Sequence, residues 1–405
     1  MKKSLLALAA MGAFAGAAQA QSSVSVYGIL DMGYAATTNE TQATSAAAVT
    51  KASARNTGNG DGGLSTSRLG FRGVEDLGKG LSAQFVLEYD LINVGTGGTG
   101  ADSNVANTTT NGAATGTGFG ARYAYVGLSD KAMGTLRLGR QEQAVFTVLA
   151  GTGLAGAGNN MAGSIYSSGV NTAVNSAAVR PVTVFLNQAI TYISPNISGV
   201  QVTGQYSSNA YEASTTTRSA GVRESGGSIS YTGINKLQLA YGIALQDWNI
   251  AAVTGVAPDA NTAQTLSVAA STGKTVQQAI AANYDFGVVR PYVNYTSIKT
   301  TASGVVTRDQ GAYEIGLRAP VTKVINVWAS SFMGTKKTAA NSATLAATTT
   351  GNADLRGWQL GSTYDFSKRT TAYAIYGTQN VKGKDAAANT KIESVGYTVG
   401  VRHSF

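Results

Sequence analysis

The residue types that usually carry catalysis are almost absent from this sequence. It has no cysteine, and its one histidine, His403, lies two residues before the end. A catalytic triad needs a base beside its nucleophile, and a zinc site needs a cluster of ligands. With no second His or Cys available, we interpret His403 as a residue at the rim of a strand. The sequence therefore predicts neither an enzyme nor a metal or cofactor site.

One motif suggests nucleotide binding but lacks its context. Residues 151–156 match the pattern G-x-G-x-x-G. The dinucleotide fingerprint also requires an acidic residue about 20 positions further on, which binds the ribose. Residues 170–182 contain no acid, so we interpret the motif as a glycine-rich loop.

Arginines placed singly within alternating segments are the remaining candidates. Successive side chains of a strand point to opposite faces, so residues of one parity share a face. The arginines that share a polar face are Arg68, Arg72, Arg122, Arg137, Arg290, Arg318 and Arg402, with Arg140 at the end of one segment. The acids on the same faces are Asp31, Glu88, Asp90 and Glu314.

Arginines lining a pore favour anions, because they stay charged and a low-dielectric wall focuses their field. We expect about half of these arginines to pair with acids on the same wall. The others predict a mild anion preference.

The segments that carry these residues have the pattern of transmembrane strands. In the final segment, Val395, Tyr397, Val399 and Val401 share one parity and Arg402 the other. In two other segments we predict that the large apolar residues share one face of the strand and their neighbours share the other face. Tyr123 and Tyr125 then share the face away from Arg122 and Ala124, and Tyr373 and Ile375 share the face away from Ala372 and Ala374. We expect the apolar parity to face lipid and the other parity to be small and polar throughout.

Tight turns alternate with long polar loops between these segments, as periplasmic turns alternate with extracellular loops in outer-membrane barrels. We count about sixteen segments, which predicts an all-β fold: a transmembrane antiparallel β-barrel wide enough for an aqueous lumen. A soluble β-sandwich would explain the alternation, but not the turn and loop asymmetry or the terminal Phe405.

Both the N-terminus and the composition fit an exported protein. Residues 1–20 combine Lys2 and Lys3, an apolar stretch and an Ala18-Gln19-Ala20 cleavage site, which predicts a signal peptide before a barrel domain of residues 21–405. No later apolar run reaches the length of a spanning helix. The chain has 30 Lys+Arg and 21 Asp+Glu, but the basic residues are scattered, so we do not expect nucleic-acid binding.

Several segments resemble the trimeric general-diffusion porins of β-proteobacterial outer membranes. They span the mature chain and occupy residues 23–31, 67–78, 122–128, 134–141, 192–199, 366–370 and 400–405. The resemblance implies a homotrimer in lipid and lipopolysaccharide. It also implies a third loop, residues 141–183, folded into the lumen. Phe405 would be the assembly signal read by periplasmic chaperones and the barrel-assembly machinery.

This chain departs from the porin pattern at the third loop. Its only acid there is Glu142 and its only base is Arg180, and Val184 stands where the family usually has an arginine. The resemblance places Arg68, Arg72, Arg122 and Arg140 in an arginine cluster beside Gln141. We expect this cluster to have little opposing negative charge, and Arg68 and Arg122 to set the anion preference.

The sequence as a whole predicts a passive channel in the cell outer membrane for small hydrophilic solutes and ions, with mild anion selectivity. One alternative is an adhesive or binding barrel with a plugged lumen. The other is a barrel hydrolase, which the missing catalytic histidine disfavours.

Overall fold

A computed structural model describes residues 23–45, 48–61, 63–92, 118–153, 184–211, 220–250, 253–256, 265–268, 271–338, 352–384 and 389–405. The strands in the first half of the chain are β1 (Ser23–Ser45), β2 (Ala48–Asp61), β3 (Arg68–Gly78), β4 (Leu81–Ile92), β5 (Gly118–Asp130), β6 (Gly134–Glu142), β7 (Phe185–Ile193) and β8 (Val200–Tyr211). The other strands are β9 (Ala220–Tyr231), β10 (Leu237–Ile250), β11 (Val253–Val256), β12 (Thr265–Val268), β13 (Ser271–Tyr284), β14 (Arg290–Ala302), β15 (Val305–Pro320), β16 (Ile325–Thr338), β17 (Ala353–Asp365), β18 (Thr370–Gly383) and β19 (Asn389–Ser404).

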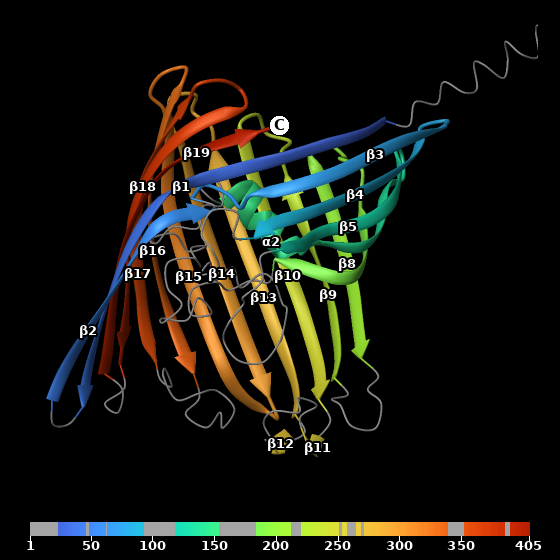
Figure 1. Cartoon of the computed structure of the whole chain (residues 1–405). Helices are drawn as coiled ribbons and strands as arrows, with labels where there is room; N and C mark the ends of the chain where they lie inside the picture. Colours follow the sequence, from blue (N-terminus) through green and yellow to red (C-terminus); the bar gives the residue numbers. More distant parts are fainter. Residues whose placement is uncertain are drawn as a thin grey trace, which may run out of the picture.

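The strands form one closed antiparallel barrel (Figure 1). Along β1, residues 23–29 pair with β3 and residues 32–45 pair with β2, so these two strands share one position in the wall. Seventeen strands therefore fill sixteen positions, as the sequence predicts. The pairing of β1 with β19 closes the ring. Closure removes the two open edges that an unclosed sheet would present to lipid. Strands β11 and β12 form a separate small hairpin.

The short turns at one rim are built by side chains that accept backbone hydrogen bonds. Asp76 accepts from the N–H of Gly78 at 2.8 Å, and Asp130 accepts from those of Ala132 and Met133 at 2.8 and 2.9 Å. Such Asx turns stabilise a tight reversal without help from the rest of the chain. In a third turn, a hydrogen bond from Arg290 holds the pKa of Asp285 below its usual range.

The C-terminal residue locks into the first strand. The backbones of Phe405 and Gly28 exchange two hydrogen bonds of 3.0 and 3.1 Å. The Phe405 ring packs directly against Gly28 and occupies the space that a side chain at position 28 would need. A Cβ atom at that position would lie 2.3 Å from ring atom Cζ. A glycine at position 28 therefore provides the seat for the terminal aromatic ring.

The two faces of the wall differ as expected in most strands, but two expectations were wrong. Val126 and Leu128 of β5 are exposed on the outer face of the barrel, and Ala124 points to the same face because it is two residues before Val126. Tyr123 and Tyr125 therefore face inward. The cause is a β-bulge between β4 and β5. Glu88 pairs with Tyr123 and the next residue, Tyr89, pairs with Ala121, so Arg122 has no partner in the ladder. This extra residue reverses the alternation of β5 between Ala121 and Tyr123.

The inner wall is also less polar than expected. Tyr373 and Ile375, predicted to face lipid, are buried with Trp328 and Leu64 in an apolar cluster. Leu64 belongs to the segment between β2 and β3, which packs against the inner side of β16 and β18. A strand face covered by another segment can carry large apolar residues, so the alternation of β18 is reversed relative to our expectation.

A short helical segment follows β6 inside the ring of strands (Figure 1). Helix α2 (Ala144–Val148) and the π-helical turn η1 (Leu149–Gly153) contact β8, β9, β10, β13 and β14. Val145, Val148 and Leu149 pack on small residues of that wall such as Ala244 and Ala279. The predicted loop thus begins by crossing to the wall formed by β8–β14. Its residues 154–183, including Arg180, lie outside the described part, as do residues 1–20.

No helix among the described residues is both long and apolar enough to span a membrane.

Candidate constriction site

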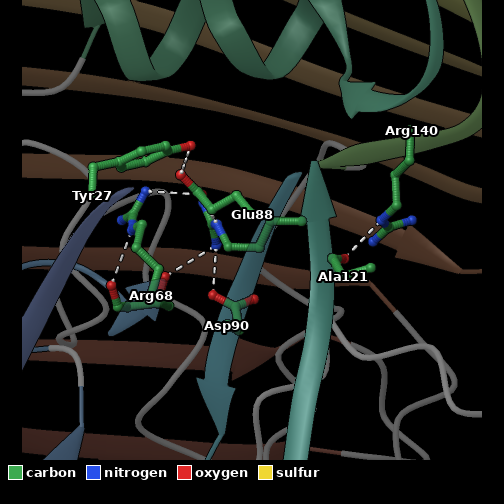
Figure 2. Close-up of polar contacts among 8 residues, drawn as sticks. Tyr27, Arg68, Glu88, Asp90, Ala121 and Arg140 are labelled. Atoms are coloured by element: carbon green, nitrogen blue, oxygen red, sulfur yellow. Dashed lines mark hydrogen bonds and ion pairs between the residues drawn. The ribbon is translucent and has the colours of Figure 1, made fainter. Parts of the chain in front are cut away.

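The arginine cluster predicted from the sequence lies where β3, β4 and β5 run side by side. Arg68 begins β3 and pairs with Asp90 of β4, and Glu88 faces the same side two residues before Asp90. The bulge in β5 turns Arg122 toward these two acids. Figure 2 shows Arg68 beside Glu88 and Asp90, with the Tyr27 hydroxyl directed at Glu88.

Arg122 is held by two carboxylates and a hydroxyl. Its Nε lies 2.7 Å from Glu88 Oε1, and its Nη1 lies 2.9 Å from Asp90 Oδ1. Nη1 also donates to the Thr66 hydroxyl at 3.0 Å. Arg122, Glu88 and Asp90 are all less than a tenth exposed. Breaking such a buried pair leaves an uncompensated charge and costs about 3–5 kcal/mol.

Arg68 and Tyr27 complete the cluster around Glu88. The guanidinium Nη1 of Arg68 lies 3.7 Å from Glu88 Oε1, and its Nε donates to the Thr66 carbonyl at 3.2 Å. The Tyr27 hydroxyl donates to Glu88 Oε2 at 3.0 Å. Two guanidinium groups therefore meet two carboxylates. Our expectation of little opposing charge was wrong, because the neighbouring strand β4 supplies the two acids that form the ion pairs.

The wall arginines share a second feature: four of them lie over aromatic rings. The Cζ atom of Arg72 is 5.2 Å from the ring centroid of Tyr27, and that of Arg137 is 4.9 Å from the centroid of Tyr125. Arg122 and Arg140 lie 5.0 and 4.9 Å from the centroid of one ring, Phe185. Cation–π contacts of this kind hold a guanidinium in place without neutralising it.

Arg140 bridges a gap in the wall and lies apart from the Arg68–Arg122 cluster (Figure 2). Strands β5 and β6 pair only as far as Ala124 and Arg140. Beyond that point Arg140 Nε donates to the Ala121 carbonyl at 2.7 Å, and its Nη1 bonds the side chain of Asn187 on β7. The side chain thus replaces ladder hydrogen bonds that the separating strands no longer make.

The third loop leaves the wall through a set of polar anchors. Glu142 hydrogen-bonds the Tyr123 hydroxyl. The next residue, Gln143, bonds the carboxylate of Glu224 on β9. Gln205 of β8 accepts from the Ala144 N–H at 2.6 Å and donates to the Glu142 carbonyl at 2.8 Å. These contacts fix the direction in which the chain enters the lumen.

Like Glu88, two further acids predicted to line the pore are buried. Asp31 is fully buried, and it accepts hydrogen bonds from the Tyr373 hydroxyl at 2.6 Å and from the N–H groups of Leu64 and Ser65 at 3.0 and 2.7 Å. It therefore anchors the segment between β2 and β3. Glu314 is 3% exposed on β15. Among the described residues, no group of three His, Cys, Asp or Glu side chains could hold a metal ion.

Sequence reasoning missed three contributors: Tyr27, Phe185 and Glu224. Tyr27 and Glu224 lie on the inner parity of their strands, so a full count of inward polar residues would have found them. Phe185 gives no such signal, because its position depends on the irregular pairing of β6 with β7.

These features define a class of protein: a closed sixteen-position β-barrel with a charged inner wall is an outer-membrane channel. Residues 7–384 match the family model described as Gram-negative porin. The chain belongs to this family and is an outer-membrane porin, which conducts small hydrophilic solutes by passive diffusion.

Individual relatives agree with this assignment. The chain is 30% identical to outer membrane porin protein 32 of Delftia acidovorans and 29% identical to an outer membrane porin protein of Bordetella pertussis; each match covers both sequences fully. Among solved structures it is similar to an anion-selective porin from Comamonas acidovorans, with a TM-score of 0.63 and 25% identity over 95% of this chain and 100% of that one. A trimeric form of OmpT from Vibrio cholerae, 14% identical, has a TM-score of 0.56 over 95% of this chain and 99% of that one.

Proposed function

We propose that this porin conducts anions in preference to cations. The observation that carries the proposal is the set of inward arginines on β3, β5 and β6, among which Arg72 and Arg137 have no acid within ion-pair distance in the described part of the chain. The similarity to the Comamonas porin, which is described as anion-selective, supports the same direction.

A planar bilayer containing the purified mature protein tests this proposal. We expect discrete conductance steps, and in a KCl gradient a reversal potential toward that of chloride. A silent record at all voltages would instead favour a plugged barrel. Steps with a potassium-directed reversal potential would contradict the anion preference while leaving the channel itself in place.

We also propose that residues 141–183 narrow the channel. The support is the inward course of α2 and η1, which carry the chain from β6 to the wall formed by β8–β14. Deleting residues 154–175, beyond the polar anchors, should raise the single-channel conductance. An unchanged conductance would place the narrowest point elsewhere.

We further propose a homotrimer with residues 1–20 removed on export and Phe405 read as the assembly signal. The sequence resemblance supports all three statements. Crosslinking in detergent that yields only monomer would contradict the trimer, and an N-terminus other than Gln21 in the outer-membrane protein would contradict the cleavage site. We propose no catalytic role, since the family consists of channels.

A further inference from the structure

Four arginines that β3, β5 and β6 place on the inner wall fall into two groups with different surroundings. Arg68 and Arg122 meet Glu88 and Asp90 at distances between 2.7 and 3.7 Å, so their charges cancel locally. Arg72 and Arg137 form no ion pair within the described residues. They contact the faces of Tyr27 and Tyr125, which are uncharged.

The unpaired arginines lie nearer the rim of short turns than the paired cluster. On β3, Arg72 is four residues further toward that rim than Arg68. On β6, Arg137 is three residues from the turn, opposite Gly127 of β5. Arg72 is exposed, and the Nε of Arg137 is buried without a hydrogen-bond acceptor in the described structure. Arg72 therefore presents its donors to the lumen, and Arg137, which is partly exposed, carries a guanidinium that no acid among the described residues neutralises.

We infer that Arg72 and Arg137 form the anion filter of this channel, and that the Arg68–Arg122 cluster contributes little net field. This inference rests on the proposed anion preference and assigns it to particular residues. A paired charge acts at a distance only as a dipole, whereas an unpaired guanidinium attracts an anion over about one Debye length, roughly 8–10 Å. Aromatic stacking leaves the planar N–H edge free for carboxylate or phosphate oxygens. The ligands expected are therefore small inorganic, phosphate and carboxylate anions.

Reversal potentials of three double variants in a KCl gradient test the assignment. R72Q/R137Q removes the proposed filter. R122Q/E88Q removes one cation and one anion of the paired cluster and so keeps its net charge. R223Q/R356Q is the matched control, because Arg223 and Arg356 are exposed and point away from the lumen. Their chain neighbours Glu224 and Leu355 are buried on the inner face.

We expect R72Q/R137Q to lower the chloride-to-potassium permeability ratio about fourfold for each charge, because a unit charge about 8 Å away in water raises the chloride and lowers the potassium concentration by about twofold each. R122Q/E88Q and the control should stay within measurement error of wild type. The inference is overturned if R72Q/R137Q keeps the wild-type ratio or if R122Q/E88Q loses it. If wild type shows no anion preference, the proposed selectivity itself fails. Should R72Q/R137Q not fold, R72Q alone carries the test, with half the shift.

Discussion

At the residue scale, an arginine in this wall has one of two roles, which its contacts distinguish. Arg122 is a buried structural cation with three polar partners, while Arg72 is an exposed cation whose contact among the described residues is the ring of Tyr27. The same residue type therefore stabilises the barrel in one place and attracts solutes in another.

Replacing Arg122 should destabilise the barrel. In R122A, Glu88 and Asp90 stay buried without their cation, so we expect a loss of about 3–5 kcal/mol in the free energy of unfolding. Urea titration followed by the gel shift between folded and heat-denatured protein measures this. R356A, which truncates an exposed outward arginine, serves as the control. Equal midpoints for the two variants would show that the ion pairs do not support the fold.

Phe185 should tune the constriction through the two guanidinium groups that lie over its ring. In F185L the cation–π contacts are lost, about 0.5–2 kcal/mol in total, and Arg122 and Arg140 gain freedom. We expect noisier open-channel current, whereas F185Y, which keeps an aromatic ring, should restore the quiet wild-type trace. Identical noise in F185L and wild type would leave Phe185 with a packing role only.

At the element scale, closure of the barrel depends on the contact between β1 and the C-terminus. Local strand pairing brings β19 beside β1, but the seat at Gly28 determines whether the terminal ring can dock. The terminal residue is thus both the end of the chain and part of the closing seam.

The variant G28A tests this seam. Its Cβ would lie 2.3 Å from Phe405 Cζ and 2.7 Å from the Arg68 carbonyl, so the ring or the strand must move. We expect a lower unfolding midpoint and slower folding into lipid vesicles. A Cβ added at Gly204 on β8 would meet no atom within 4 Å, so G204A is the matched control and should behave as wild type. A wild-type midpoint for G28A would contradict the seat.

At the scale of the whole molecule, the channel encloses positive charge, which no acid among the described residues pairs at Arg72 and Arg137, in a lumen with a low-dielectric wall. Such an arrangement concentrates counter-ions, and its effect depends on ionic strength because dissolved ions screen the field. Selectivity and salt concentration are therefore coupled.

The salt dependence of selectivity follows from this coupling. Raising KCl from 0.1 to 1 M shortens the Debye length from about 10 to about 3 Å. We therefore expect the chloride-to-potassium permeability ratio to fall toward one across that range, at a constant concentration ratio between the two sides. A ratio that stays constant would mean that selectivity arises from direct, short-range contacts in place of a long-range field.

The sequence by itself determined the class of fold, because the features that specify it are local. Alternation has a period of two residues, turn residues such as Asp76 and Asp130 act within three positions, and a chain of sixteen such segments in lipid has to close. The inward positions of Arg68, Arg72 and Arg137 follow from the same periodicity.

Only the tertiary structure decided how those charges combine. The bulge at Arg122 arises from pairing between β4 and β5 and reverses the face of Tyr123 and Tyr125. The inner apolar cluster around Tyr373 depends on a segment that lies more than 300 residues earlier in the chain. Which arginine meets an acid depends on the register between strands, and a one-residue shift moves every side chain to the other face. For that physical reason, the sequence predicts a charged lumen, but only the paired strands show which charges remain unbalanced.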